Sequence, residues 1–304
     1  MFREKIPGKQ LSGWVFAALV PVLIQLGAGG SWAVVGGVAL ICGVAVWLVW
    51  RFGSHRWRWT CVPQFLLLAV VMGELLADAA SSWPGDNYPA VPLILLALGA
   101  GSAGKGASAA ARVGCVLFWF VLLVYLAVFG AGVGSVRVDQ LRPWWGSVRA
   151  EVVLLLLVPA AATSLLREGE GWNRRSVLPG AFLVAASVLV SGVMSPALAE
   201  EGFYEMSRGL ELWGTVSRFE PVISAGMTLG WFSLVTLLMS MCGRLAERIR
   251  KSWGRRGVYI GAAGGAAWML CDLHISMVLL MVLVSIFWVL MPLLEQGIGR
   301  EKKS

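Results

Sequence analysis

The sequence predicts an all-α polytopic membrane protein with about ten transmembrane helices, arranged as two sets of five. The chain is 58% hydrophobic and 14% charged, and its mean hydropathy is +0.76. Soluble domains carry about 25% charged residues. Apolar runs close to the roughly 20 residues that cross a bilayer recur along the whole chain. Basic residues also gather in alternate loops, which is typical of a multispan topology.

The first set contains five apolar runs, none of which holds a lysine or arginine. Their predicted ranges are 11–26, 32–50, 62–80, 89–103 and 113–133. The first and fourth runs are shorter than the roughly 20 residues of an ordinary span. The third run carries two carboxylates, Glu74 and Asp78, which makes it the most polar of the five.

The second set follows the same plan and also opens on a short run. Its predicted ranges are 151–166, 177–195, 222–242, 258–274 and 275–294. Asp272 and His274 lie where the last two runs meet, as expected of an outer turn. Residues 1–294 therefore form one transmembrane domain, with repeats at about 11–133 and 151–294 and a cytoplasmic tail at 295–304.

The distribution of basic residues predicts that both chain ends are cytoplasmic. With the N-terminus inside, 20 of the 25 lysines and arginines fall in cytoplasmic segments and 5 fall in outer loops. Such asymmetry orients membrane proteins, and an even number of spans places both ends on one side. The net charge of +8 follows from this topology, so no nucleic-acid partner is expected.

Prolines interrupt the opening span of each set at matching positions. Pro21 lies about 15 Å into span 11–26, and Pro159 lies about 12 Å into span 151–166, at about 1.5 Å per residue. A proline removes one helical hydrogen bond and frees a carbonyl group. Interrupted spans at corresponding places of two halves point to an inverted-repeat transporter with its site between the halves.

Polar residues near these breaks are candidates for ligand binding. Gln25 and Gly27 follow Pro21, and Glu151 opens the span that holds Pro159. Glu74 is an ionisable residue deep in a span, where charge is costly and often functional. Two interpretations of Glu74 stay open: coupling to a proton or cation, and a structural hydrogen bond to a neighbouring helix.

The outer loop 196–221 carries an amphipathic pattern. Phe203, Met206, Leu210 and Trp213 recur at helical spacing. The charged residues considered for coupling and lid function are Arg208, Glu211, Arg218 and Glu220. The pattern predicts a helix on the outer face, which is either a lid over a cavity or a helix packed over loop ends.

Motifs of soluble enzymes are missing from the sequence. There is no phosphate-binding loop of the type GxxxxGK[ST], no HExxH zinc motif and no CxxC pair among the five cysteines. We therefore expect no enzymatic activity, no cofactor and no metal site.

Several short motifs resemble the B subunits of spore germinant receptors, the GerAB-like permeases. These motifs are Lys5–Gln10, Tyr88-Pro89-Ala90-Val91, Lys105-Gly106-Ala107 with Ala111-Arg112, Leu141-Arg142-Pro143, Glu151 to Pro159, Ser207-Arg208-Gly209-Leu210-Glu211 and Ser217-Arg218-Phe219-Glu220. They are spread over nearly the whole chain. Unlike the family pattern, Gly27, Gly29 and Gly30 follow the first span rather than lying within it.

The resemblance implies the amino acid–polyamine–cation (APC) transporter superfamily and a LeuT-type 5+5 inverted repeat. It also implies binding of a small polar nutrient, an amino acid, in a complex with other germinant-receptor subunits. The location implied is the bacterial cell membrane or the spore inner membrane. Two alternatives stay open: a secondary amino-acid transporter of the same superfamily, and a non-catalytic membrane scaffold.

Overall fold

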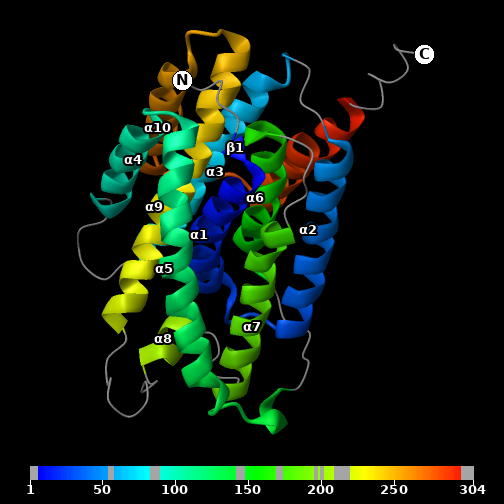
Figure 1. Cartoon of the computed structure of the whole chain (residues 1–304), viewed down its shortest axis with the longest axis vertical. Coiled ribbons are helices and arrows are strands. Elements are labelled where there is room, and N and C mark those ends of the chain that lie inside the picture. Colours follow the sequence, from blue (N-terminus) through cyan, green and yellow to red (C-terminus); the bar gives the residue numbers. More distant parts are fainter. Residues whose placement is uncertain are drawn as a thin grey trace.

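The computed structural model describes residues 6–53, 58–82, 90–141, 148–168, 174–194, 198, 202–208 and 220–295. Most of the helices run along the long axis of the molecule (Figure 1). The principal helices are α1 (Gly8–Gly27), α2 (Trp32–Phe52), α3 (Cys61–Ser82), α4 (Ala90–Ala103), α5 (Ala107–Val133), α6 (Ala150–Leu166), α7 (Leu178–Val193), α9 (Glu220–Ile249), α10 (Gly254–Leu270) and α11 (Met277–Val284).

Short elements complete the fold. The strands β1 (Ile6–Pro7) and β2 (Arg167–Glu168) pair in parallel, and α8 (Gly202–Arg208) is a short helix. The π-helical segment η4 (Ser285–Leu290) continues α11, and the chain stays helical to residue 295. The remaining short elements are the 3-10 turns η1 (Val138–Gln140) and η2 (Arg174–Val177).

Among the described residues, seven helices are long and apolar enough to cross a membrane, judged by length and composition alone. They cover Gly8–Gly27, Trp32–Phe52, Cys61–Ala80, Ala107–Val133, Arg175–Val193, Pro221–Ile249 and Met277–Glu295. The apolar helices α4 and α6 are shorter, with 14 and 17 residues. The structure therefore supports an all-α membrane protein, while the count of ten spans stays a prediction.

Every predicted span overlaps a helix, but three spans differ from their helix by four or more residues at one or both ends. α5 begins at Ala107 rather than 113, α9 continues to Ile249 rather than 242, and α10 covers Gly254–Leu270 rather than 258–274. A hydropathy pattern places the end of a span near the first arginine after it, whereas the helix itself can continue beyond the membrane. Beyond residue 242, for example, Arg244 and Glu247 form an ion pair at 3.0 Å along the helix surface.

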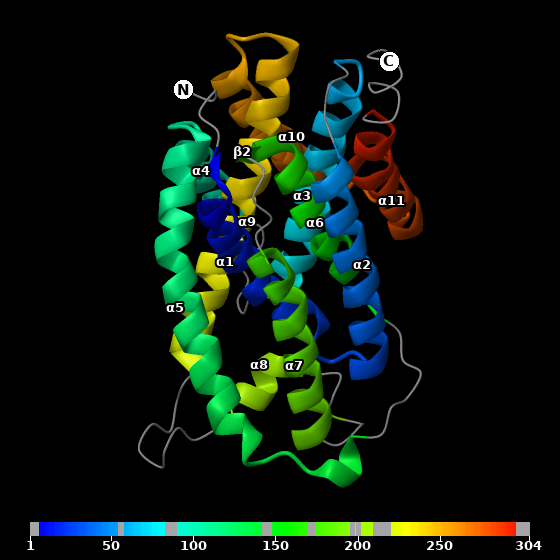
Figure 2. The same cartoon turned by 45° about the vertical axis from the view of Figure 1, so that its right-hand side comes forward.

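The principal helices pack as two groups of four with two flanking helices. Within the group α3, α4, α9 and α10, every helix contacts every other one. In the second group, α1 and α2 each contact both α6 and α7. α5 lies against α1 and α9, and α11 lies against α6 and α3; Figure 2 shows α5 and α11 on opposite flanks.

Small residues allow the closest of these contacts. Gly114 on α5 lies directly under the side chain of Trp14 on α1, and a β-carbon at Gly114 would collide with the indole. Glycine at such points lets two membrane helices approach closely without a hydrophobic driving force from water.

Segments predicted to share one side of the membrane gather at one end of the molecule. The β1–β2 pairing joins residues before α1 to residues after α6, and Thr60 Oγ1 lies 3.2 Å from Glu295 Oε1. In Figure 1, β1 and the upper tips of α9 and α10 lie at this end, and α8 lies near the other. Which end faces the cytoplasm stays a prediction.

Candidate ligand-binding site

A polar contact joins the two helix groups in the interior. The Nε1–H group of Trp231 on α9 donates a hydrogen bond to Oε1 of Gln25 on α1, at 2.8 Å. Trp231 is fully buried, and Gln25 is half-buried. Trp231 lies eleven residues into α9, or about 16 Å at about 1.5 Å per residue. That depth is near the middle of a hydrocarbon core of about 30 Å.

Pro21 lies one turn from Gln25 and is covered by α9. A β-carbon added to Gly230 would lie 2.6 Å from Cβ and Cγ of Pro21, so only glycine fits there. α1 is nevertheless helical from Gly8 to Gly27, and α6 is helical through the buried Pro159. The interruptions that the sequence predicts at the two prolines are therefore not breaks in either helix. A helix can lose one hydrogen bond at a proline when its neighbours pack around the bend.

Gly27 marks the point where three helices meet. A β-carbon at Gly27 would lie 2.9 Å from atoms of both Val152 on α6 and Leu183 on α7. Its carbonyl oxygen accepts a hydrogen bond from the Ser187 hydroxyl at 3.5 Å. Glu151, in the first turn of α6, is the neighbour of Val152 and is half-buried. Gly27 therefore lies at this helix crossing, and Glu151 is adjacent in sequence to one of the residues that form it.

The two prolines lie at matching depths from this crossing. Pro21 precedes Gly27 by six residues, and Pro159 follows Val152 by seven. These separations correspond to about 9 Å and about 10 Å of helix rise. α1 and α6 contact each other, but a site shared by the two prolines stays a prediction. Pro21 itself packs against Gly230 of α9.

The end of this region opposite β1 is covered by α8, which contacts α1, α7 and α9. Phe203 and Met206 are buried, so the first two positions of the predicted apolar stripe face the core. The Phe203 ring stacks on Tyr125 of α5 with 5.7 Å between ring centroids, and it meets Phe129 edge-on at 5.9 Å. Aromatic pairs at these distances add attraction beyond buried area.

The predicted coupling residues are described only in part. Arg208 is the last residue of α8, and Glu220 is the first residue of α9. Glu211 and Arg218, like Leu210 and Trp213 of the apolar stripe, lie outside the described residues.

Glu74 lies apart from the Gln25–Trp231 pair. Its Oε1 accepts hydrogen bonds from Trp268 Nε1 on α10 and from the backbone N–H of Ile275, both at 3.1 Å. Its Oε2 lies 3.9 Å from Nδ1 of His274. Only 4% of Glu74 is exposed. These contacts match the structural interpretation of Glu74, a hydrogen bond to a neighbouring helix.

Sequence reasoning missed Trp231 and Ser187. Most tryptophans of the chain fall near predicted span ends, where headgroup anchoring explains them. Trp231 instead falls in the middle of span 222–242, where its N–H group needs a partner inside the membrane. The mid-span position of Trp231 was therefore the feature of the sequence that could have identified it as a site residue. No comparable signal marked Ser187, because serine is frequent in membrane helices.

Comparison with known proteins adds no relative: no family model matches this chain, and no curated protein matches it.

Proposed function

We propose that this chain is a permease-like membrane subunit that binds a small polar nutrient, an amino acid, near the bilayer midplane. Its fold in this proposal is the LeuT-type 5+5 inverted repeat, and its role is that of a germinant-receptor B subunit acting in spore germination. The site lies where α1, α6, α7 and α9 meet. The membrane in question is the bacterial cell membrane or the spore inner membrane, with both chain ends cytoplasmic.

The observation that carries the proposal is an exchange symmetry in the helix contacts. Exchanging the first five principal helices with the last five, in order, pairs α1 with α6, α2 with α7, α3 with α9, α4 with α10 and α5 with α11. Under this exchange the α1–α5 contact becomes the α6–α11 contact, and both are present. The α2–α6 and α3–α10 contacts become α7–α1 and α9–α4, which are also present. An inverted repeat requires this kind of correspondence.

Among the described residues, the α1–α9, α6–α9 and α4–α5 contacts have at most weak counterparts under this exchange. The α1–α9 contact is the most extensive of the three, and it holds the polar pair. α1 packs extensively on α9, whereas among the described residues its counterpart, α6 on α3, is at most a weak contact. Gln25 and Trp231 lie on the α1–α9 contact. Binding sites of inverted-repeat transporters lie near the midplane at the interface of the repeats, and this asymmetric contact has that position.

The residues around the site suit a zwitterion. A glutamine amide both donates and accepts hydrogen bonds, the Ser187 hydroxyl does the same, and an ionised Glu151 accepts them. A free amino acid presents an ammonium group that donates and a carboxylate that accepts. Binding of such a ligand opens the contact between α1 and α9 and passes the change to partner subunits through the outer helix α8.

Secondary amino-acid transport is the second candidate function. A coupling charge favours transport, and Glu74 was the candidate for that charge. Its carboxylate is already engaged by Trp268 and Ile275, so the receptor function is preferred. A measurement of amino-acid binding distinguishes a scaffold from the receptor and the transporter, because only a scaffold binds no amino acid.

A radiolabelled amino-acid panel, applied to the purified full-length protein, tests the proposal. Gln25→Ala should raise the Kd of any bound amino acid about tenfold, because a lost hydrogen bond to a polar ligand costs about 1–3 kcal/mol. Pro159→Ala should also weaken binding, since it restores the missing N–H donor and straightens α6. Gln140→Ala, which removes the same side chain type from η1, is the matched control and should bind as the wild type does.

Unchanged affinity in both site variants places the ligand elsewhere. If the wild type binds no amino acid alone or together with co-expressed partner subunits, the chain is a scaffold and the proposal fails.

A further inference from the structure

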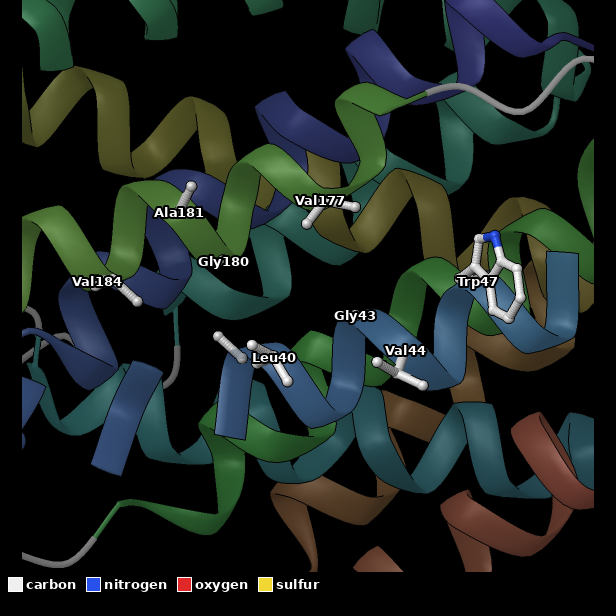
Figure 3. A pocket seen from close by; sticks show the side chains of 9 residues that line it. Leu40, Gly43, Val44, Trp47, Val177, Gly180, Ala181 and Val184 are labelled. Carbon is white, nitrogen blue, oxygen red and sulfur yellow. The ribbon is translucent and has the colours of Figure 1, made fainter. Parts of the chain in front are cut away.

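An apolar groove runs between α2 and α7. Its volume is about 380 Å³. Leu40, Val44 and Trp47 of α2 form one wall, and Gly180 and Ala181 of α7 belong to the other (Figure 3). Small residues line both sides of the groove, Ala39 and Gly43 on α2 and Gly180 and Ala181 on α7, and they leave the space between the helices unfilled. A β-carbon added to Gly43 would still lie 3.8 Å from the nearest atom, which belongs to Val177.

The α2 wall faces outward from the protein. Leu40 is 69% exposed and Val44 is 49% exposed. Both lie on a helix that is long and apolar enough to cross a membrane. In a bilayer this surface is covered either by lipid chains or by another helix.

The shape and lining of the groove suit a hydrocarbon chain. From Leu40 to Trp47 the helix rises about 10 Å, and every residue that lines the groove along this length is apolar. A lipid chain is therefore the occupant that the surrounding bilayer itself supplies.

One end of the groove carries a headgroup-binding chemistry. Leu40, Val44, Trp47 and Arg51 follow one another on a single face of α2. The Trp47 ring meets Phe52 edge-on with 6.3 Å between centroids, and the Arg51 guanidinium lies 5.8 Å from the centroid of Phe52. Figure 3 shows the indole of Trp47 at one end of the labelled side chains. Tryptophan marks the level of lipid headgroups, and arginine there attracts anionic lipids.

We infer that the α2–α7 groove binds one acyl chain of an anionic phospholipid, with the lipid phosphate at Arg51. This lipid site does not depend on the proposed nutrient site. It differs from the general lipid annulus because it combines a slot for one chain with a cation at the slot's end.

Native mass spectrometry of the full-length protein tests the site by counting retained lipids. Phosphatidylglycerol and phosphatidylcholine with identical chains are the probes. The wild type should retain one phosphatidylglycerol more strongly than phosphatidylcholine. Arg51→Gln should reduce that preference about fivefold, the factor that corresponds to about 1 kcal/mol per cation near an anionic surface. Arg255→Gln, an exposed cation on α10, is the matched charge control and should keep the preference.

Filling the groove should remove retention of both lipids. Gly43→Leu fills it from α2, and Ala181→Leu fills it from α7, so a folding defect in one variant leaves the other as a test. Gly37→Leu is the matched control, because Gly37 lies on the same helix with no atom within 4 Å of its added β-carbon. Circular dichroism checks that each variant is folded.

Two results overturn the inference. The first is equal retention of phosphatidylglycerol by folded Gly43→Leu, Ala181→Leu and Gly37→Leu proteins. The second is a concentration-dependent dimer, or a complex with a partner subunit, that Gly43→Leu and Ala181→Leu abolish while lipid retention stays unchanged. That result assigns the groove to a protein helix.

Discussion

Trp231 and Gln25 are 206 residues apart in the sequence, and their side chains meet at 2.8 Å. The hydrogen bond links the first helix of one half to the third principal helix of the other. It satisfies a buried indole N–H group that has no water nearby in a bilayer interior. The α1–α9 contact is therefore held by one specific polar interaction as well as by close packing.

Replacing Trp231 with phenylalanine isolates this hydrogen bond. Trp231→Phe keeps an aromatic ring on α9 but removes the donor to Gln25, so the free energy of unfolding should fall by about 1 kcal/mol. Thermal unfolding in detergent measures the change. Trp119→Phe, at a position that is 60% exposed on α5, is the control. Equal stability of the two variants contradicts the prediction.

Gly230→Ala tests the fit between Pro21 and α9. A β-carbon at Gly230 lies 2.6 Å from the rigid proline ring, whereas one at Gly226 lies 3.9 Å from Val124. Overpacking of this kind costs about 1–3 kcal/mol, so Gly230→Ala should unfold at a lower temperature than the wild type. Gly226→Ala should be neutral or stabilising, because alanine is the better helix former. A Gly230→Ala protein as stable as Gly226→Ala is the contrary outcome.

Glu74→Ala and Glu74→Gln separate a structural role from a coupling role. Glu74→Ala leaves the Trp268 indole and the Ile275 amide without their acceptor, at a cost of about 1–3 kcal/mol for each buried donor. Glu74→Gln keeps an oxygen acceptor and should keep both stability and ligand response. Stability is measured by thermal unfolding, and response is measured by ligand binding. A stable Glu74→Gln protein that no longer responds to its ligand supports cation coupling instead.

Cysteine labelling tests the predicted topology. The natural cysteines Cys42, Cys61, Cys115, Cys242 and Cys271 are first replaced by serine or alanine. Ser135→Cys lies after α5 and Ser252→Cys lies between α9 and α10. A membrane-impermeant maleimide added to intact cells should label Ser135→Cys and should reach Ser252→Cys only after lysis. Labelling of both before lysis refutes the ten-span arrangement with cytoplasmic ends.

Local patterns predicted the helices well and predicted their partners poorly. The apolar runs located every principal helix, because burial in lipid requires long stretches without charge. The boundary of α9 was missed because Arg244 and Glu247 support each other on a helix that continues beyond the apolar run. The π-helical turn at Ser285–Leu290 was not predicted, since nothing in an apolar run distinguishes one helical hydrogen-bond register from another.

In the candidate site, too, single residues could be proposed from the sequence but their partners could not. Pro21, Pro159 and Gln25 were chosen as candidates from their positions within spans. The contact of Pro21 with Gly230 depends on a glycine two hundred residues away, and a single sequence carries no record of that pairing. For Glu74 the sequence left two roles open, coupling to a proton or cation and a structural hydrogen bond. The hydrogen bond from Trp268 to Glu74 is visible only in the structure.

The pairing of β1 with β2 constrains how the membrane domain can move. Residues immediately before α1 and immediately after α6 share one short stretch of backbone ladder, with Ile6 opposite Arg167 and Pro7 opposite Glu168. The ends of α1 and α6 on that side are therefore clasped. A conformational change that opens a path on that side must therefore either break the β1–β2 pairing or move α1 and α6 together.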